Sequence, residues 1–381
     1  MNEIEQGPIR PPSEAQSLLL RVTRNCSWNQ CEFCHIYKGE RFSARTVEEV
    51  KKDIDTIREM ASEITAISWN KGFGGEINAS LVSSLLHRPH VLPEGYRSVI
   101  LWLHRGAKNV FLQDANNLAL KTKDLVEMLT YLQKAFPTVE RITTYTRART
   151  IARKTLAEMK ELRDAGLSRI HTGLESGYDK ILALAKKGVT PSELVDAGRK
   201  VKEAGISLSE YIMPGLGGRK MWREHALETA KVLNQIDPDF IRVRTLKVLQ
   251  IMPLYQKVLN GELELMGDDE IIVEERLLIE NLEGIHSHFA SDHILNLLEE
   301  LDGVFPEAKP VMLAAIDRYL ALDQSERENF RLGRRGSFYH SLDDLQNSGL
   351  RSHVDQIRQR IERERPGQFE EVISDLMESF I

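Results

Sequence analysis

Residues 24–35 read RNCSWNQCEFCH and contain all three cysteines of the chain, Cys26, Cys31 and Cys34. Thiolates this close in sequence can converge on one metal centre without help from the rest of the fold. A structural zinc site takes four nitrogen or sulfur ligands, and the adjacent His35 is too near Cys34 to complete a tetrahedron easily. An iron–sulfur cluster held by three thiolates leaves one iron open. We favour this cluster; zinc, and structural or redox thiols, remain the alternatives.

The composition describes an ordinary globular protein. Of 381 residues, 41% are hydrophobic and 28% charged, and the net charge is -6. This balance gives no global attraction to nucleic acid or to an anionic membrane, so neither is an expected partner. The polar start of the chain has no secretory signal, and the apolar run Leu18–Leu20 is too short to span a bilayer. We therefore expect a cytoplasmic protein.

Strand and helix patterns alternate after the first residues. Two capping boxes, at 46–49 and 190–193, predict helix starts, and Gly166 and Gly205 predict helix ends. Apolar, β-rich stretches predict six strands, at 17–22, from 109, and at 141–146, 168–172, 206–213 and 239–248. Six strand–helix units with short connections predict an α/β fold, a partial (β/α)6 TIM-like barrel with a helical C-terminal extension.

These patterns also predict a domain organisation. We expect an N-terminal tail at 1–16, a barrel core at 17–250 with a less regular insertion at about 62–108, and a mostly helical extension at 251–381. The insertion contains Gly74-Gly75-Glu76, which no strand followed by a helix frames. The extension contains a His-rich loop at 286–296. A second metal site, a substrate or lid contact and a plain surface loop all remain open for this loop.

Polar residues follow several of the predicted strands. They are Asp114, Asn116 and Glu175, with the cysteines after the first strand, and a glycine-rich turn that contains Gly215 follows another strand. In parallel sheets, ligands bind at the carboxyl ends of strands, so these positions predict one shared site. The alternatives are a helix-capping turn at Asp114 and Asn116 and an exposed loop carboxylate at Glu175. Arg244 either binds a carboxylate from the last strand or belongs to a solvated strand face.

The cysteine stretch resembles the radical S-adenosylmethionine (SAM) superfamily. Its Cys-x4-Cys-x2-Cys spacing has one residue more in the first gap than the usual motif and is similar to an uncharacterised subgroup. Gly173-Leu174-Glu175-Ser176-Gly177 resembles coproporphyrinogen-oxidase-like and methylthiotransferase-like members. The similarity covers about residues 17–300.

The resemblance implies a set of site residues and a chemistry. Cys26, Cys31 and Cys34 would hold a [4Fe–4S] cluster whose fourth iron binds SAM. Phe33, beside the adenine, and Asp114, Asn116, Glu175, Gly215 and Arg244 would contact SAM, whereas Gly74-Gly75-Glu76 is taken as a chance copy of the amine-binding motif. One-electron reduction would cleave SAM, and the 5′-deoxyadenosyl radical would abstract hydrogen from a substrate that the sequence does not identify. A flavodoxin or ferredoxin would supply the electron.

Two features of some radical SAM enzymes are missing from the sequence, which reduces the number of reactions to be expected. No cobalamin-binding domain precedes the cysteines, and no further cysteine exists for an auxiliary cluster. Cobalamin-dependent methyl transfer and methylthiolation are therefore not expected. A porphyrinogen-type oxidative decarboxylase of the same superfamily is one alternative, and a non-catalytic iron–sulfur or zinc-binding protein is another. No catalytic residue is assigned.

Overall fold

The computed structural model describes residues 3–87 and 92–380. Residues 1–2 of the predicted tail, 88–91 of the predicted insertion (with Pro89) and 381 of the predicted extension lie outside the described residues. Internal contacts divide the chain into two units. The first unit is Met1–Asn29, Ile36–Thr172 and Asp196–Leu208, and the second is Gln30–His35, Gly173–Val195 and Ser209–Ile381. The predicted domain division follows the strand–helix alternation instead and stays a prediction.

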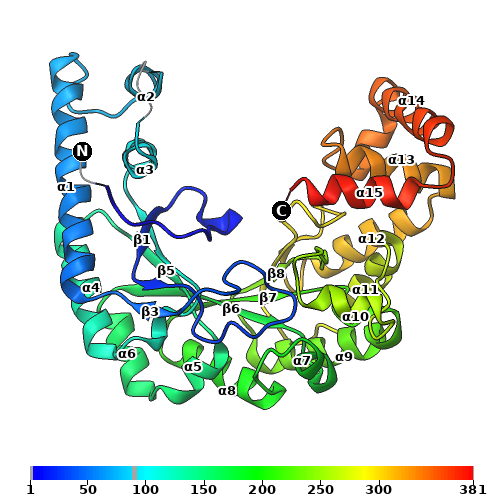
Figure 1. Ribbon diagram of the computed structural model, residues 1–381, viewed down its shortest axis with the longest axis horizontal. Helices are drawn as coiled ribbons and strands as arrows, with labels where there is room; N and C mark the ends of the chain where they lie inside the picture. Colours follow the sequence, from blue (N-terminus) through cyan, green and yellow to red (C-terminus); the bar gives the residue numbers. More distant parts are fainter. Residues whose placement is uncertain (1–2, 88–91, 381) are drawn as a thin grey trace. The chain divides into compact units, whose positions relative to one another are not determined.

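Strands and helices alternate along the described chain (Figure 1). The strands are β1 (Leu18–Arg21), β2 (Thr23–Arg24), β3 (Ser43–Ala44), β4 (Asn109–Gln113), β5 (Arg141–Tyr145), β6 (Leu167–Glu175), β7 (Ser207–Ile212), β8 (Phe240–Val243), β9 (His288–Ala290) and β10 (Asp302–Val304). The first ten helices are α1 (Val47–Asn70), α2 (Ala79–Leu86), α3 (Glu94–His104), α4 (Thr122–Ala135), α5 (Ala148–Arg153), α6 (Leu156–Asp164), α7 (Asp179–Leu184), α8 (Pro191–Glu203), α9 (Gly218–Ile236) and α10 (Leu254–Leu259). They are followed by α11 (Asp268–Glu280), α12 (Lys309–Leu320), α13 (Gln324–Arg335), α14 (Ser348–Glu364) and α15 (Phe369–Glu378). Short 3-10 turns lie at Pro12–Glu14, Asn117–Ala119 and Leu342–Gln346.

Parallel pairing organises the strands of the first unit. β1 pairs with β4, β4 with β5 and β5 with β6, all in parallel. The register places Arg21, the last residue of β1, opposite Gln113, the last residue of β4. Helix α1 packs on α3 and α4 in this unit (Figure 1). The parallel register therefore brings the carboxyl ends of β1 and β4 to one edge.

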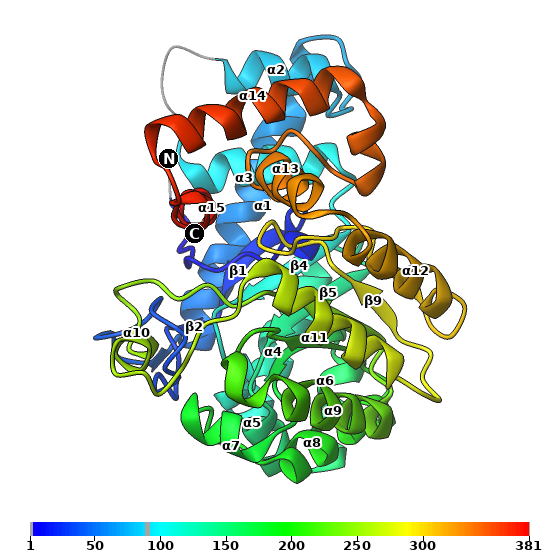
Figure 2. The same cartoon turned by 90° about the vertical axis from the view of Figure 1, so that its right-hand side faces the viewer.

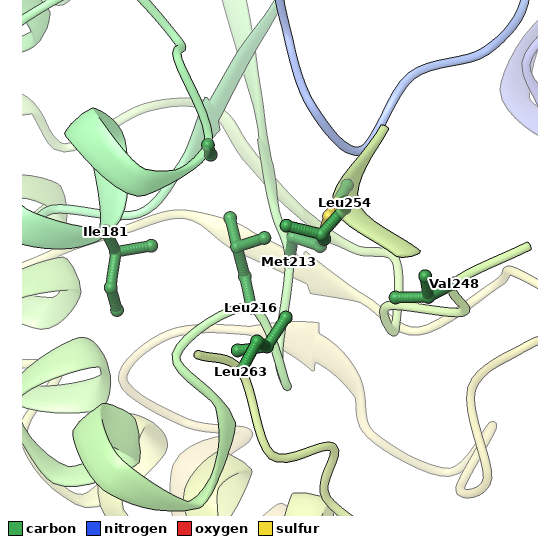
Figure 3. Packing of buried hydrophobic residues seen from close by; sticks show 7 residues of the cluster. Ile181, Met213, Leu216, Val248, Leu254 and Leu263 are labelled. Carbon is green, nitrogen blue, oxygen red and sulfur yellow. The ribbon is translucent and has the colours of Figure 1, made fainter. Parts of the chain in front are cut away.

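The second unit continues the same pattern and adds helices. β7 pairs with β8 and β8 with β9 in parallel, whereas β10 is antiparallel to β9. Its C-terminal helices include α13, which packs on α14 and α15 (Figure 2). A core cluster consists of Ile181, Ala185, Met213, Leu216, Val248, Leu254 and Leu263 (Figure 3). In the described residues, the six strand–helix repeats and mostly parallel pairing confirm the predicted α/β class with a helical extension.

Local signals explain where several helices begin. Thr46 accepts the Glu49 N–H, and the Glu49 carboxylate accepts the Thr46 N–H, so the predicted capping box starts α1. The second predicted box, between Thr190 and Glu193, is formed in the same way at the start of α8. A third box, between Thr155 and Glu158, starts α6.

Three segments differ from the secondary structure predicted for them. The stretch expected to be less regular, 62–108, holds the end of α1 and then α2 and α3. The last predicted strand, 239–248, ends at Val243. The His-rich loop contains a short strand, β9, because its backbone pairs with β8. Among the described residues, no helix is both long enough and apolar enough to cross a membrane.

Candidate functional site

Asp114 follows β4 and lies fully buried in the first unit. Its Oδ2 lies 2.7 Å from Nη2 of Arg21 and accepts the backbone N–H of Asn25 at 3.2 Å. Its Oδ1 accepts the Tyr37 hydroxyl at 3.0 Å. Both carboxylate oxygens are therefore bonded to residues on either side of Cys26.

Residues near the N-terminus, Gly7 among them, pack against the Asp114 carboxylate. The Gly7 N–H donates to Gln113 Oε1 at 2.8 Å, and Gln113 Nε2 donates back to the Gly7 carbonyl at 2.9 Å. A Cβ at Gly7 would lie 2.2 Å from Asp114 Oδ1, so only glycine fits here. Glu5 bonds Arg24 and Arg21, and the hydrogen bond from Arg24 is the main cause that lowers the pKa of Glu5.

Asn116 ties the loop that contains Cys26 to the end of β5. Its Nδ2 donates to Ser27 Oγ at 2.6 Å and to Thr150 Oγ1 at 2.9 Å. Its Oδ1 accepts the Thr146 hydroxyl at 2.7 Å and the Arg147 N–H at 3.0 Å. The side-chain amide thus uses all of its hydrogen-bonding groups within the first unit. The roles of Asp114 and Asn116 as SAM contacts stay predictions, while their bonds position the segment around Cys26.

The three cysteines are half-buried and form no disulfide, and their donor atoms suit an iron–sulfur cluster. Cys31 and Cys34 share one turn of the second unit, in which the Cys34 N–H donates to the Cys31 carbonyl at 3.3 Å. Between them, Glu32 donates its N–H to Ala185 and accepts that of Leu254, each at 2.9 Å. In the part of the chain that the structure describes, no three His, Cys, Asp or Glu side chains form a group that could hold a metal ion. The ligand assignment therefore stays a prediction.

Phe33 and Glu175 are linked through Lys187 in the second unit. Lys187 Nζ lies 2.7 Å from Glu175 Oε1 and 5.6 Å from the centre of the Phe33 ring. Phe33 packs against the core cluster. Glu175 is the last residue of β6, has a positive φ of 62° and is 8% exposed. It is therefore a buried, paired carboxylate rather than the exposed loop carboxylate of the alternative reading.

Gly215 is hydrogen-bonded to Glu274, which in turn contacts His225, and the sequence singled out neither of these two residues. Its N–H donates to Glu274 Oε2 at 2.8 Å. Glu274 Oε1 lies 2.6 Å from His225 Nδ1, and His225 Nε2 lies 3.1 Å from the Glu175 carbonyl oxygen. Glu274 and His225 thus connect the turn after β7 with the end of β6. Both looked like ordinary polar helix positions, and only their burial in α11 and α9 marks them.

Arg244 follows β8, and its positive charge helps to lower the pKa of two histidines. Burial, and then the nearby Arg244, lowers the pKa of His35 and lowers that of His293 to about 4. Arg242 instead pairs with Asp292 at 2.7 Å. The other two histidines of the His-rich loop have separate partners, since His286 lies 3.3 Å from Asp237 and His288 3.1 Å from Asp302.

Residues 83–230 match the family model of the radical SAM superfamily. Over 116 residues, the chain is 25% identical to the tRNA uridine(34) acetyltransferase of Methanocaldococcus infernus, covering 30% of this chain and 22% of that protein. Among solved structures, it is similar to coproporphyrinogen III oxidase from Escherichia coli, with 16% identity, a TM-score of 0.47 and coverage of 70% of this chain and 52% of that one. It is also similar to an N-terminally truncated Methanocaldococcus infernus Elp3, with 19% identity, a TM-score of 0.40 and 52% of each chain covered.

Residues 83–230, less than half of the chain, match the radical SAM superfamily, whose members are enzymes that use a [4Fe–4S] cluster and SAM. The predicted family and its pair of cofactors are thereby confirmed. The matched region begins after the three cysteines, and the aligned region spans about a fifth of the curated acetyltransferase.

Proposed function

We propose that this chain is a radical SAM enzyme in which Cys26, Cys31 and Cys34 hold the [4Fe–4S] cluster. One observation carries the proposal: the only cysteines of the chain lie within nine residues, ahead of a region that matches the superfamily model. When bound, the cluster and SAM supply a 5′-deoxyadenosyl radical that abstracts hydrogen from a substrate. A flavodoxin or ferredoxin is the proposed electron donor, and the cytoplasm the proposed location.

The protein's own residues position and shield this chemistry. Asn116 fixes Ser27, next to Cys26, and Asp114 fixes the Asn25 backbone on the other side. In the second unit, the backbone bonds of Glu32 hold the turn that contains Cys31 and Cys34. We propose that Phe33, Glu175, Gly215 and Arg244 contact SAM, together with Asp114 and Asn116. Restraint of this kind around ligands typically improves metal affinity.

Anaerobic reconstitution with iron and sulfide tests the proposal. The full-length protein should bind four irons per chain, as the proposed [4Fe–4S] cluster requires, and should release 5′-deoxyadenosine and methionine from SAM when dithionite is added. Replacement of each cysteine by serine should abolish both properties, whereas Ser192→Ala, at an exposed position, should change neither. Stoichiometric zinc together with no SAM cleavage would refute the proposal.

A further inference from the structure

The second unit contains a pocket of about 460 Å³ among α11, α13, α15 and the segment after β8. A volume of this size lies within the range of small-molecule sites. Part of its wall is apolar, formed by Leu246, Val248, Ile271, Ile373 and Met377. Val248 also belongs to the core cluster (Figure 3), so this wall is anchored in the packed interior of the unit.

Two cations face the pocket from positions that are largely buried. Arg331, which is 6% exposed, donates to Asp268 at 3.0 Å and to both oxygens of Glu370 at 2.7 and 2.6 Å. Lys247, whose side chain is 11% exposed, bonds Ser374 Oγ at 2.5 Å and lies 3.2 Å from Glu378. Glu370, Ser374 and Glu378 all belong to α15.

The buried charges around this pocket do not balance without α15. Asp268, whose side chain is 4% exposed, is shared by Arg331 and by Arg335. Burial raises the pKa of the neighbouring Glu275 to about 8, so this carboxyl is mostly protonated at neutral pH and offsets little charge. The remaining positive charge is offset by Glu370 and Glu378, whose side chains are 68% and 50% exposed. A buried cation requires a partner, whereas an exposed glutamate is equally well solvated by water.

We propose that this pocket binds an organic anion, a carboxylate or phosphate group on an apolar body. The anionic group pairs with Arg331 and Lys247 in place of Glu370 and Glu378, and the body lies against the apolar wall. Arginine pairs with carboxylate and phosphate through two parallel hydrogen bonds, as it already does with Glu370. Gly215, a proposed SAM contact, also lines this pocket. Anion binding is tested without the cluster and without SAM, so its failure is distinguishable from failure of the proposed function.

Calorimetric titration of the full-length chain with octanoate and with octyl phosphate tests this site, with n-octanol as the neutral probe. At least one anion should bind saturably, and octanol about tenfold or more weaker, a difference of ~1.4 kcal/mol. The anion that binds identifies the preferred head group. Glu370→Gln and Glu378→Gln remove the competing carboxylates and should tighten anion binding several-fold, and Lys247→Met should weaken it.

Glu371→Gln is the matched control, because Glu371 is an exposed residue of α15 that lies 3.6 Å from Arg365 and does not line the pocket. It should leave anion affinity unchanged. Thermal melting of each variant verifies that it is folded. In Glu370→Gln, Arg331 keeps Asp268 as its charged partner. Octanol binding as tightly as the anions would overturn the proposal. Failure of both anions to bind the wild-type protein and Glu370→Gln would also overturn it.

Discussion

Arg21 Nη2 lies 2.7 Å from Oδ2 of Asp114. Arg21 is the last residue of β1, and Asp114 directly follows the neighbouring parallel strand β4 in the first unit. The Arg21 side chain is 14% exposed and that of Asp114 is fully buried. Because the carboxylate is shielded from water, Arg21, the Tyr37 hydroxyl and the Asn25 N–H supply the hydrogen bonds that water would otherwise make. This pair is therefore a structural element of the segment that leads to Cys26.

Asp114→Asn should lower the free energy of unfolding by about 2 kcal/mol, because Arg21 loses a charged partner but keeps Glu5. Urea denaturation measures the change. Asp164→Asn, at an exposed position, should stay within about 0.5 kcal/mol of the wild type. Equal stability of Asp114→Asn and the wild type would contradict a structural role for the pair.

Asn116→Ala removes four hydrogen bonds: one to Ser27, and three to residues 146–150, which follow β5. In reconstituted protein, iron should be lost to a chelator on the order of tenfold more readily, as for other residues that support metal ligands. Asn70→Ala, at an exposed position at the end of α1, serves as the control and should keep the wild-type rate. An unchanged rate in Asn116→Ala would show that Ser27 does not restrain Cys26.

Glu175→Gln tests the proposed SAM contact. If the carboxylate binds SAM, KM for SAM should rise about tenfold, or ~1.4 kcal/mol, in assays of 5′-deoxyadenosine formation. A purely structural role through Lys187 predicts a lower melting temperature with unchanged KM. Glu203→Gln, at an exposed position at the end of α8, should alter neither quantity.

Gly177→Ala should destabilise the protein by about 2 kcal/mol, because overpacking forces the backbone to move. A Cβ at this position would lie 2.2 Å from the Glu228 carbonyl oxygen of α9. Gly349→Ala is the matched change, since its Cβ would meet nothing closer than 3.4 Å, and in a helix it should be neutral or stabilising. Thermal melting compares the two variants, and similar melting temperatures would argue against close packing at Gly177.

Glu275 predicts a pH dependence of stability. Burial, and then the adjacent Glu274, raises its pKa from 4.5 to about 8, so between these values the folded protein binds more protons than the unfolded chain. Stability should therefore fall as pH rises from about 4.5 to 8, with a limiting slope of about 1.4 kcal/mol per pH unit. Denaturation of Glu275→Gln across this range should show a shallower slope, and Glu283→Gln, at an exposed position, should retain the wild-type slope. If the free energy of unfolding depends on pH in the same way in all three proteins, the pKa of Glu275 is not raised by folding.

Much of the fold was predictable, because strand and helix signals are local. Alternation of apolar strands with capped helices predicted six repeats and the starts of α1 and α8. Strand β9 has three residues and exists because β8 pairs with it, so no local pattern predicted it. In the segment expected to be irregular, glycines lie between α1 and α2, and Pro93 precedes α3. Helix α3 packs on α1, and α2 packs on α3, so their apolar faces are buried.

The sequence indicated candidate site positions but not the bonds that these residues make. Strand ends marked Asp114 and Glu175 as candidate site residues; both are buried, and their roles as SAM contacts stay predictions. Their partners Arg21, Tyr37 and Lys187 lie elsewhere in the chain and carry no motif. Gly177, which follows Glu175 and Ser176, packs on the backbone of α9. Tertiary packing thus decided what each predicted position contacts.

Gly7 and Gln113 exchange two hydrogen bonds across a separation of 106 residues. During synthesis, residues 5–9 must therefore wait until β4 has left the ribosome before their partners exist. Contacts of such long range slow folding, because a large loop must close before they form. The Asp114 carboxylate is therefore covered late in folding, and the cysteine segment beside it reaches its final conformation only after β4 is in place.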